Sequence, residues 1–278
     1  MYTIIGIGGV GTRIAKNFEK FPQYNIVCLD DEDTGQKHQI VLKKEKTPEL
    51  YEESFKKIPA SVKKAIKDKV VCVVSGASLV SSVVLKFLYE LRDREIKIIY
   101  IKPESDLLAE TKRKQEKVVF SVLQEYARSG LFKDICLISN TNMDVLVEDA
   151  SIAEYYPTMN SLIANTFHMI MVFDNQNPEV SNFSEIMESR RIYTLGLLDQ
   201  NSGEEKTFFS IDIPLENRLY YGIVEENLNK NKSLQRNIIK LIKRKNQEFC
   251  KYSYAVYGTR YENDFCYMKS YTSKVQDF

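Results

Sequence analysis

Apolar runs of strand length alternate with helical patterns through the first 140 residues, and this alternation constrains the fold more than any other feature. The strand-like runs are Tyr2–Ile7, Tyr24–Leu29, Val70–Val74, Ile96–Ile101 and Ile135–Ile138. The helical patterns between them cover about Thr12–Lys20, Glu49–Lys67 with a break near Pro59, Ser78–Arg92 and Lys112–Ser129. Strands without a polar face must be covered on both sides. The pattern therefore predicts an α/β fold with a Rossmann-like parallel sheet and helices on both faces.

The pattern changes after Asn140. A long apolar stretch over about Asp149–Phe173 predicts a buried central helix, and Pro157 either disturbs it or marks its true start. The remainder is rich in tyrosine, with strands predicted at Thr207–Ile213, Leu219–Glu225, Tyr252–Gly258 and Phe265–Tyr271 and a helix at Ser233–Cys250. We therefore predict two domains, residues 1–173 and a smaller α+β domain of residues 174–278.

Composition excludes several classes of function. The net charge is +1, and no apolar run reaches the roughly 20 residues that span a bilayer, so we expect a cytoplasmic protein without membrane insertion. Five widely spaced cysteines without a CxxC pair predict free buried thiols and no metal site. With only His38 and His168 available, the sequence also argues against a histidine-dependent hydrolase.

A glycine loop, Gly6-Ile7-Gly8-Gly9-Val10-Gly11, follows the first strand and opens a helix. Glycines let the backbone approach a phosphate closely, and free N–H groups at a helix N-terminus favour the anion. Asp30 and Asp31 close the second strand about 20 residues later, as in a dinucleotide-binding unit. A tight strand–helix turn without any ligand explains the loop as well, and both interpretations stay open here.

Later segments resemble the FtsZ/tubulin family, in order and over nearly the whole chain. A strand ends in Lys102-Pro103, another ends just before Asn140, and a central helix is followed by the loop Asn182–Met187. The segment from Tyr220-Tyr221-Gly222 to Tyr257-Gly258 is similar to the family's C-terminal domain. The resemblance is closer to the bacterial and archaeal FtsZ proteins than to eukaryotic tubulin.

The resemblance implies binding of GTP or GDP, with Mg²⁺ accompanying the nucleotide, and head-to-tail self-association. The residues that match the family's nucleotide contacts are Gly6, Gly8, Gly9, Val10 and Gly11 for phosphate, Gly76 and Ser78 in the second loop, Glu110 and Arg113 for ribose, and Asn140 and Tyr155 for the base. In the family, acids on the loop after the central helix reach the nucleotide of the neighbouring subunit. The matching positions here are Asn182 and Glu185.

The chain also departs from the family. Its second loop, Ser75–Ser82, has one glycine where the family has several, and one hydrolytic acid is replaced by Asn182. Because asparagine cannot take up a proton, we expect GTP hydrolysis to be weak or lost, and whether the chain is an enzyme stays open. Two alternatives remain: a non-catalytic FtsZ-like binding module, and a Rossmann-type enzyme that uses NAD or an adenylate.

Residues 230–251 hold eight lysines and arginines against one acid, Glu248. This segment predicts either a solvated outer face or a surface for an acidic partner or nucleic acid.

Overall fold

The computed structural model describes residues 1–230, 232–246 and 249–277. Its described strands form one sheet in the order β3-β2-β1-β4-β5-β6-β8-β12-β10-β11-β7, with β9 beside β8. The strands of the N-terminal half are β1 Tyr2–Ile7, β2 Tyr24–Asp30, β3 Gln39–Val41, β4 Lys69–Val74, β5 Glu95–Lys102 and β6 Asp134–Ser139. Those of the C-terminal half are β7 Val180–Ser181, β8 Ile192–Leu198, β9 Glu205–Thr207, β10 Glu216–Val224, β11 Lys251–Thr259 and β12 Phe265–Thr272.

The N-terminal half of the sheet is parallel throughout, as the apolar runs predict. Gly6 of β1 lies opposite Cys28 of β2 and Val73 of β4, and β4, β5 and β6 continue in the same direction. The C-terminal half is mixed, because β12 runs antiparallel to both β8 and β10. Parallel pairing of Ile135–Leu137 in β6 with Ile192–Thr194 in β8 joins the two halves into one sheet.

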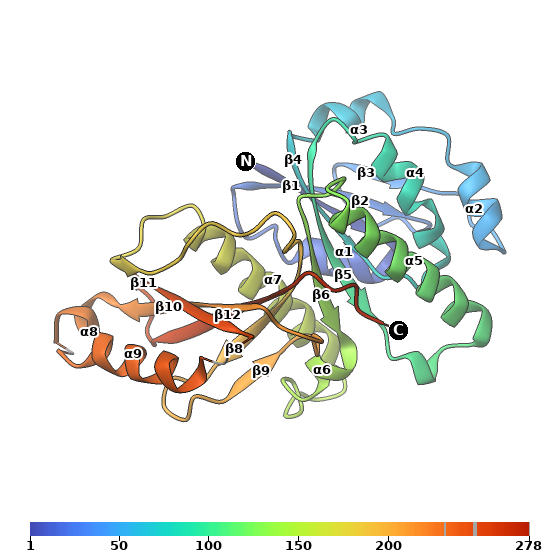
Figure 1. Ribbon diagram of the computed structural model, residues 1–278. Helices are drawn as coiled ribbons and strands as arrows, with labels where there is room; N and C mark the ends of the chain where they lie inside the picture. Colours follow the sequence, from blue (N-terminus) through green and yellow to red (C-terminus); the bar gives the residue numbers. More distant parts are fainter. Residues whose placement is uncertain (231, 247–248, 278) are drawn as a thin grey trace.

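Helices cover both faces of the sheet (Figure 1). They are α1 Gly8–Lys16, α2 Pro48–Ser54, α3 Ala60–Ala65, η1 Leu79–Val83, α4 Val84–Tyr89, η2 Ser105–Leu107, α5 Glu110–Arg128, α6 Asn140–Asp144, α7 Tyr155–Phe173, α8 Glu225–Lys230 and α9 Leu234–Lys245. On one face, Phe87 of α4 and Phe120 of α5 are buried in a single apolar core. On the other face, α1 and α7 share a second core. This arrangement confirms the predicted α/β fold.

The central helix α7 contacts both halves of the sheet. Phe167 meets Phe18, which follows α1, edge to face at 6.2 Å, and Phe173 stacks on Tyr257 of β11 at 4.3 Å. The helix begins at Tyr155, not near Asp149 as expected, so Pro157 lies in its first turn, where the missing N–H costs little. The domain boundary after Phe173 stays a prediction.

In the C-terminal half one prediction was wrong and one strand was missed. The expected strand Thr207–Ile213 is a strand only to Thr207, where β9 ends. Beyond it, Phe208 and Phe209 are buried in the two cores on opposite faces of the sheet, so the apolar pattern reflects packing. The sequence analysis also missed β8, although this strand connects the two halves.

Two further findings concern the described residues as a whole. None of their helices is long and apolar enough to cross a membrane. The five cysteines are free and buried, as predicted.

Candidate functional site

The first loop, residues 6–11, is a direct junction between β1 and α1. The helix begins at Gly8, one turn earlier than predicted, and Gly8 adopts φ +70°, which glycine reaches without strain. A methyl group added at Gly11 would lie 2.2 Å from the carbonyl oxygen of Val73, and one at Gly6 would lie 2.6 Å from the carbonyl oxygen of Gly11. Gly6 and Gly11 therefore allow α1 to pack closely on the sheet.

Gly9 is different, because a methyl group added there would meet side-chain atoms only, and at ordinary van der Waals distance. A methyl group there would have its nearest neighbours at 3.8 Å, Nη2 of Arg13, and at 4.0 Å, Oδ2 of Asp30. Asp30 is buried at the end of β2, and burial raises the pKa of its carboxyl group above the usual value. Gly9 is therefore the position of the first loop at which a ligand can approach the backbone, between a guanidinium and a carboxyl group.

The second loop, residues 75–82, is filled by groups of this chain. A methyl group at Gly76 would lie 2.3 Å from the hydroxyl oxygen of Tyr100, so the loop passes directly over this side chain. Ser81 Oγ donates to the carbonyl oxygens of Gly76 and Ser78, and Gln115 Nε2 donates to Ser78 at 2.7 Å. The amide and hydroxyl groups of Ser81 are thus engaged within the protein.

Apolar side chains of the second loop turn inward. Val80 is buried in the core beneath α4 and α5, and Leu79 packs against the same core. The Ser78 side chain makes no capping hydrogen bond to η1; its hydroxyl faces Gly8, where an added methyl group would lie 2.9 Å from it. The first and second loops therefore touch through Ser78 and Gly8.

A buried acid lies directly behind the second loop. Glu116 of α5 is fully buried and accepts a hydrogen bond from the Tyr100 hydroxyl at 2.8 Å, while its Oε2 has no partner among the described residues. Desolvation raises the pKa of Glu116, and it lowers the pKa of Lys102 nearby. A phosphate bound at this loop would meet a carboxyl group instead of a ring of amides.

The predicted ribose and base residues lie on segments that follow parallel strands. Glu110 and Arg113 are exposed in the first turn of α5, where Glu110 pairs with Lys114 at 2.7 Å. Asn140 is half-buried and begins α6 directly after β6. Because β1, β4, β5 and β6 are parallel, the segments that follow them meet at one edge of the sheet, the usual place for a ligand in such folds.

Tyr155 begins α7 and contacts α6. Its hydroxyl donates a hydrogen bond to Asp144 Oδ1 at 2.7 Å, and burial together with Asp144 raises the pKa of Tyr155 to about 12. The ring meets Tyr156 edge to face at 5.1 Å. Tyr155 thus fixes the start of α7 beside the segment that carries Asn140.

Glu185 lies at the opposite edge of the sheet, whereas Asn182 lies beside Tyr254 of β11. Glu185 lines a groove of about 530 Å³ together with Lys133 and Asp134, where β6 begins. Asn182 Oδ1 accepts a hydrogen bond from the Tyr254 N–H at 2.7 Å, so its amide oxygen is bonded to the backbone of β11. Within one chain, Glu185 and the first loop are separated by the length of the strands.

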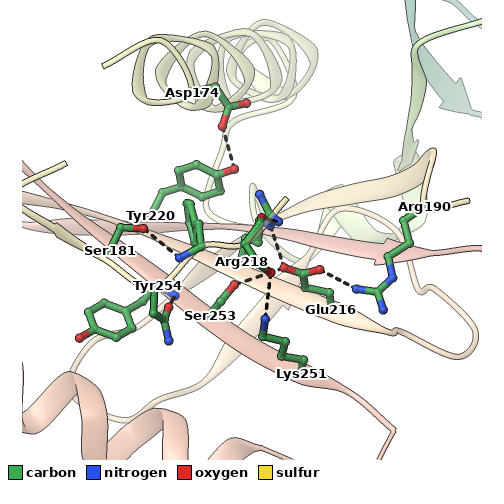
Figure 2. A network of polar contacts seen from close by, with 12 residues as sticks. Asp174, Ser181, Arg190, Glu216, Arg218, Tyr220, Lys251, Ser253 and Tyr254 are labelled. Carbon is green, nitrogen blue, oxygen red and sulfur yellow. Dashed lines mark hydrogen bonds and ion pairs between the residues drawn. The ribbon is translucent and has the colours of Figure 1, made fainter. Parts of the chain in front are cut away.

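A buried charged network holds the 182–187 loop in place, and the sequence analysis missed it. Glu216, 1% exposed, pairs with Arg190 at 2.6 Å and with Arg218 at 2.8 Å (Figure 2). Arg218 also donates to the Ser184 carbonyl oxygen and lies over the Phe183 ring at 5.0 Å. The available signal was the spacing of Glu216 and Arg218, which are two residues apart and so share one face of a strand.

A second ion pair, between the buried Lys269 and the more exposed Asp174, lies at the end of α7. Lys269, 7% exposed, pairs with Asp174 at 2.6 Å. Asp174 also accepts a hydrogen bond from the Tyr220 hydroxyl at 2.9 Å (Figure 2). Burial acts to raise the pKa of Asp174, but Lys269 and Tyr220 outweigh it and hold the pKa below its usual value. The loop that starts at Asp174 is therefore anchored at both ends.

No group of three or more His, Cys, Asp or Glu within the described ranges could hold a metal ion. The carboxyl group nearest to Gly9 is that of Asp30, whose Oδ2 lies 4.0 Å from the position of an added methyl group.

The comparisons with known proteins identify the fold. No family model matches the chain, and no curated protein matches it. Among solved structures, TubZ of Bacillus thuringiensis serovar israelensis, in a GTPγS-form protofilament, matches with a TM-score of 0.66 and 13% identity, covering 99% of this chain and 87% of that one. A GTPγS-bound protofilament of CetZ2 from Haloferax volcanii matches with a TM-score of 0.69 and 12% identity, covering 98% of this chain and 92% of that one. An empty FtsZ dimer from M. jannaschii matches with a TM-score of 0.68 and 12% identity, covering 98% of this chain and 87% of that one. The protein therefore has an FtsZ/tubulin-like fold, as the resemblance predicted.

Proposed function

We propose that this protein is a self-assembling, FtsZ/tubulin-like cytoskeletal protein that binds a guanine nucleotide at the edge of the sheet formed by the C-terminal ends of its parallel strands. One observation carries the proposal: Gly9 and Glu185 lie at opposite edges of one continuous sheet. Neither residue can reach the other within a chain, but head-to-tail association brings them together. The solved relatives printed as protofilaments support this arrangement.

The roles of the residues follow from their places. The first loop would bind phosphate through backbone amides at Gly8, Gly9, Val10 and Gly11. Glu110 and Arg113 would face the ribose, and Asn140 and Tyr155 the base. Asp30 would meet an accompanying Mg²⁺, since a carboxylate next to a phosphate is favourable only with a cation between them.

Hydrolysis would be slow or absent. The second loop uses the amide and hydroxyl groups of Ser81 internally, and phosphoryl transfer depends on several positioned groups acting together. Glu185 is the one acid among Asn182–Met187, so it alone could polarise a water for the neighbouring subunit.

The non-catalytic alternative, an assembly module without nucleotide, is favoured by the same closed second loop. The Rossmann-type oxidoreductase or adenylate enzyme is not, because the central helix and the C-terminal strands belong to the FtsZ/tubulin-like fold. The two remaining hypotheses differ in whether assembly responds to GTP or GDP.

Sedimentation of the purified chain with GTP, GDP, ATP, NAD and no nucleotide separates them. The proposal predicts a pellet that depends on guanine nucleotide and on protein concentration. Any GTP hydrolysis should rise with protein concentration and be lost in Glu185→Gln, with Glu188→Gln on the same segment as the matched control. Assembly that does not depend on nucleotide supports the non-catalytic module. A protein that stays monomeric under every condition contradicts both hypotheses.

A further inference from the structure

The charge of this protein is distributed unevenly. Residues 230–251 contain eight of its 39 lysines and arginines and one of its 38 acids, which leaves +7 on this segment and −6 on the rest of the chain. The other lysine-rich segment, residues 43–69, carries nine lysines but also five acids. The imbalance of residues 230–251 is thus a local property of a nearly neutral protein. Positions 231, 247 and 248 lie outside the described residues.

The helix α9 presents this charge on one side. Ile238 and Ile242 are buried against the C-terminal strands, on the face of the sheet opposite α7. Arg236, Lys240 and Lys243 are exposed and follow each other at spacings of four and three, so they lie along one face of the helix. Figure 1 shows α9 on the outer surface of the C-terminal half, next to α8.

These cations are not used inside the protein. The α9 sequence contains no acid, and no ion pair between described residues involves Arg236, Lys240 or Lys243. By contrast, Lys245 at the inner side of α9 pairs with Glu205 at 2.8 Å, and the neighbouring Lys230 pairs with Glu226 at 2.9 Å. The like charges therefore repel each other along the helix without a compensating contact.

We propose that this basic face, formed by Arg236, Lys240, Lys243 and Arg244, binds the phosphate backbone of duplex DNA without reading its sequence. Lysine and arginine neutralise phosphates, and the amide side chains of Gln235 and Asn237, both exposed beside the cations, donate to phosphate oxygens as well. A helix of 12 residues is about 18 Å long, which spans several phosphates of a duplex.

An anionic membrane fits the observations less well. A helix that lies in a membrane surface inserts its apolar side, whereas Ile238 and Ile242 are buried in the protein. Phe249 is 76% exposed beyond the end of α9 and offers a single apolar contact. Vesicles are therefore included as an arm of the test.

The test measures anisotropy of a fluorescein-labelled 30-base-pair duplex with the full chain at 50 and 200 mM KCl. With about four phosphate contacts, affinity should fall about 100-fold over this range, a slope near −3.6. Lys240→Gln should make the slope shallower by about 0.9. The triple variant Arg236→Glu/Lys240→Glu/Lys243→Glu should weaken binding at least 100-fold at 50 mM.

The matched control is Lys56→Glu/Lys57→Glu/Lys64→Glu, which makes the same charge change at three exposed lysines elsewhere and should stay within threefold of the wild type. Equal losses in both triple variants, or wild-type binding in the α9 variant, overturn the proposal. Binding to phosphatidylserine vesicles or to polyglutamate but not to the duplex also overturns it. If circular dichroism shows that the α9 triple variant is unfolded, the slope of Lys240→Gln decides.

Discussion

Gly9 and Gly11 should respond in opposite ways to the same substitution by alanine. A methyl group at Gly11 would lie 2.2 Å from the carbonyl oxygen of Val73, a backbone atom that cannot move without displacing β4. The same group at Gly9 meets nothing closer than 3.8 Å. One glycine is needed for packing, and the other leaves room for a ligand.

The expected magnitudes follow from these distances. Gly11→Ala forces α1 away from β4 and should destabilise the protein by about 3 kcal/mol or more, because overpacking of this kind is not relieved by a rotamer change. For a chain of this size that is a fall of roughly 6–12 °C in Tm. Gly9 lies in the first turn of α1 with ordinary φ, so Gly9→Ala should leave stability unchanged or raise it by up to about 1 kcal/mol.

Thermal and urea unfolding, combined with calorimetric titration of GTP and GDP, provide the assay. Gly9→Ala should weaken nucleotide binding at least tenfold, or about 1.4 kcal/mol, while its Tm stays at or above that of the wild type. A Tm loss in Gly9→Ala as large as that in Gly11→Ala would refute the packing argument. Unchanged nucleotide affinity in Gly9→Ala would refute the assignment of the site.

Three other predictions concern buried charge. Arg218→Met leaves Glu216 short of a partner and should lower the free energy of unfolding by about 3 kcal/mol in urea titrations, whereas Lys114→Met, at an exposed pair, should change it by less than about 0.5 kcal/mol. Burial lowers the pKa of His168 from 6.5 to about 4, so the stability that the neutral imidazole contributes is complete above pH 6.5 and is lost as the pH falls toward 4. The free energy of unfolding should therefore fall by about 2 kcal/mol at pH 5, and this fall should be absent in His168→Gln. A wild-type free energy of unfolding that does not change between pH 7 and pH 5 would contradict this prediction. Asp30→Asn removes a negative charge beside Gly9, so it should raise nucleotide affinity severalfold in buffer with EDTA but not in buffer with Mg²⁺. If calorimetry shows the same effect of the substitution on affinity in both buffers, Asp30 is excluded from the site.

Much of the N-terminal half could be predicted from the sequence because its strands are buried on both faces. Continuous apolar runs such as Val70–Val74 leave no alternative to a covered strand. In the C-terminal half, β8 contains Gly196 and follows two arginines, and its strand character depends on pairing with β6 and β12 far away in the sequence. Local pattern carries no information on such partners.

The candidate site divides in the same way. The first loop is local, since a strand, a turn and a helix follow one another within Tyr2–Lys16, and its glycine spacing predicted the junction. The closure of the second loop depends on Tyr100 and Glu116, which approach Gly76 only after the sheet and α5 have formed. The small number of glycines predicted that the second loop would bind phosphate weakly, but it could not predict which side chains fill the loop.

Disulfide cross-linking tests head-to-tail assembly most directly. The native cysteines are all buried, so cysteines introduced at exposed Arg13, beside Gly9, and at exposed Glu185 will react selectively. The two positions lie at opposite edges of the sheet and cannot pair within one chain. Mild oxidation of Arg13→Cys/Glu185→Cys in the presence of guanine nucleotide should give a ladder of linked oligomers, while each single variant gives dimers at most. The absence of a ladder at concentrations where the protein sediments, or a ladder in either single variant, would contradict the proposed assembly.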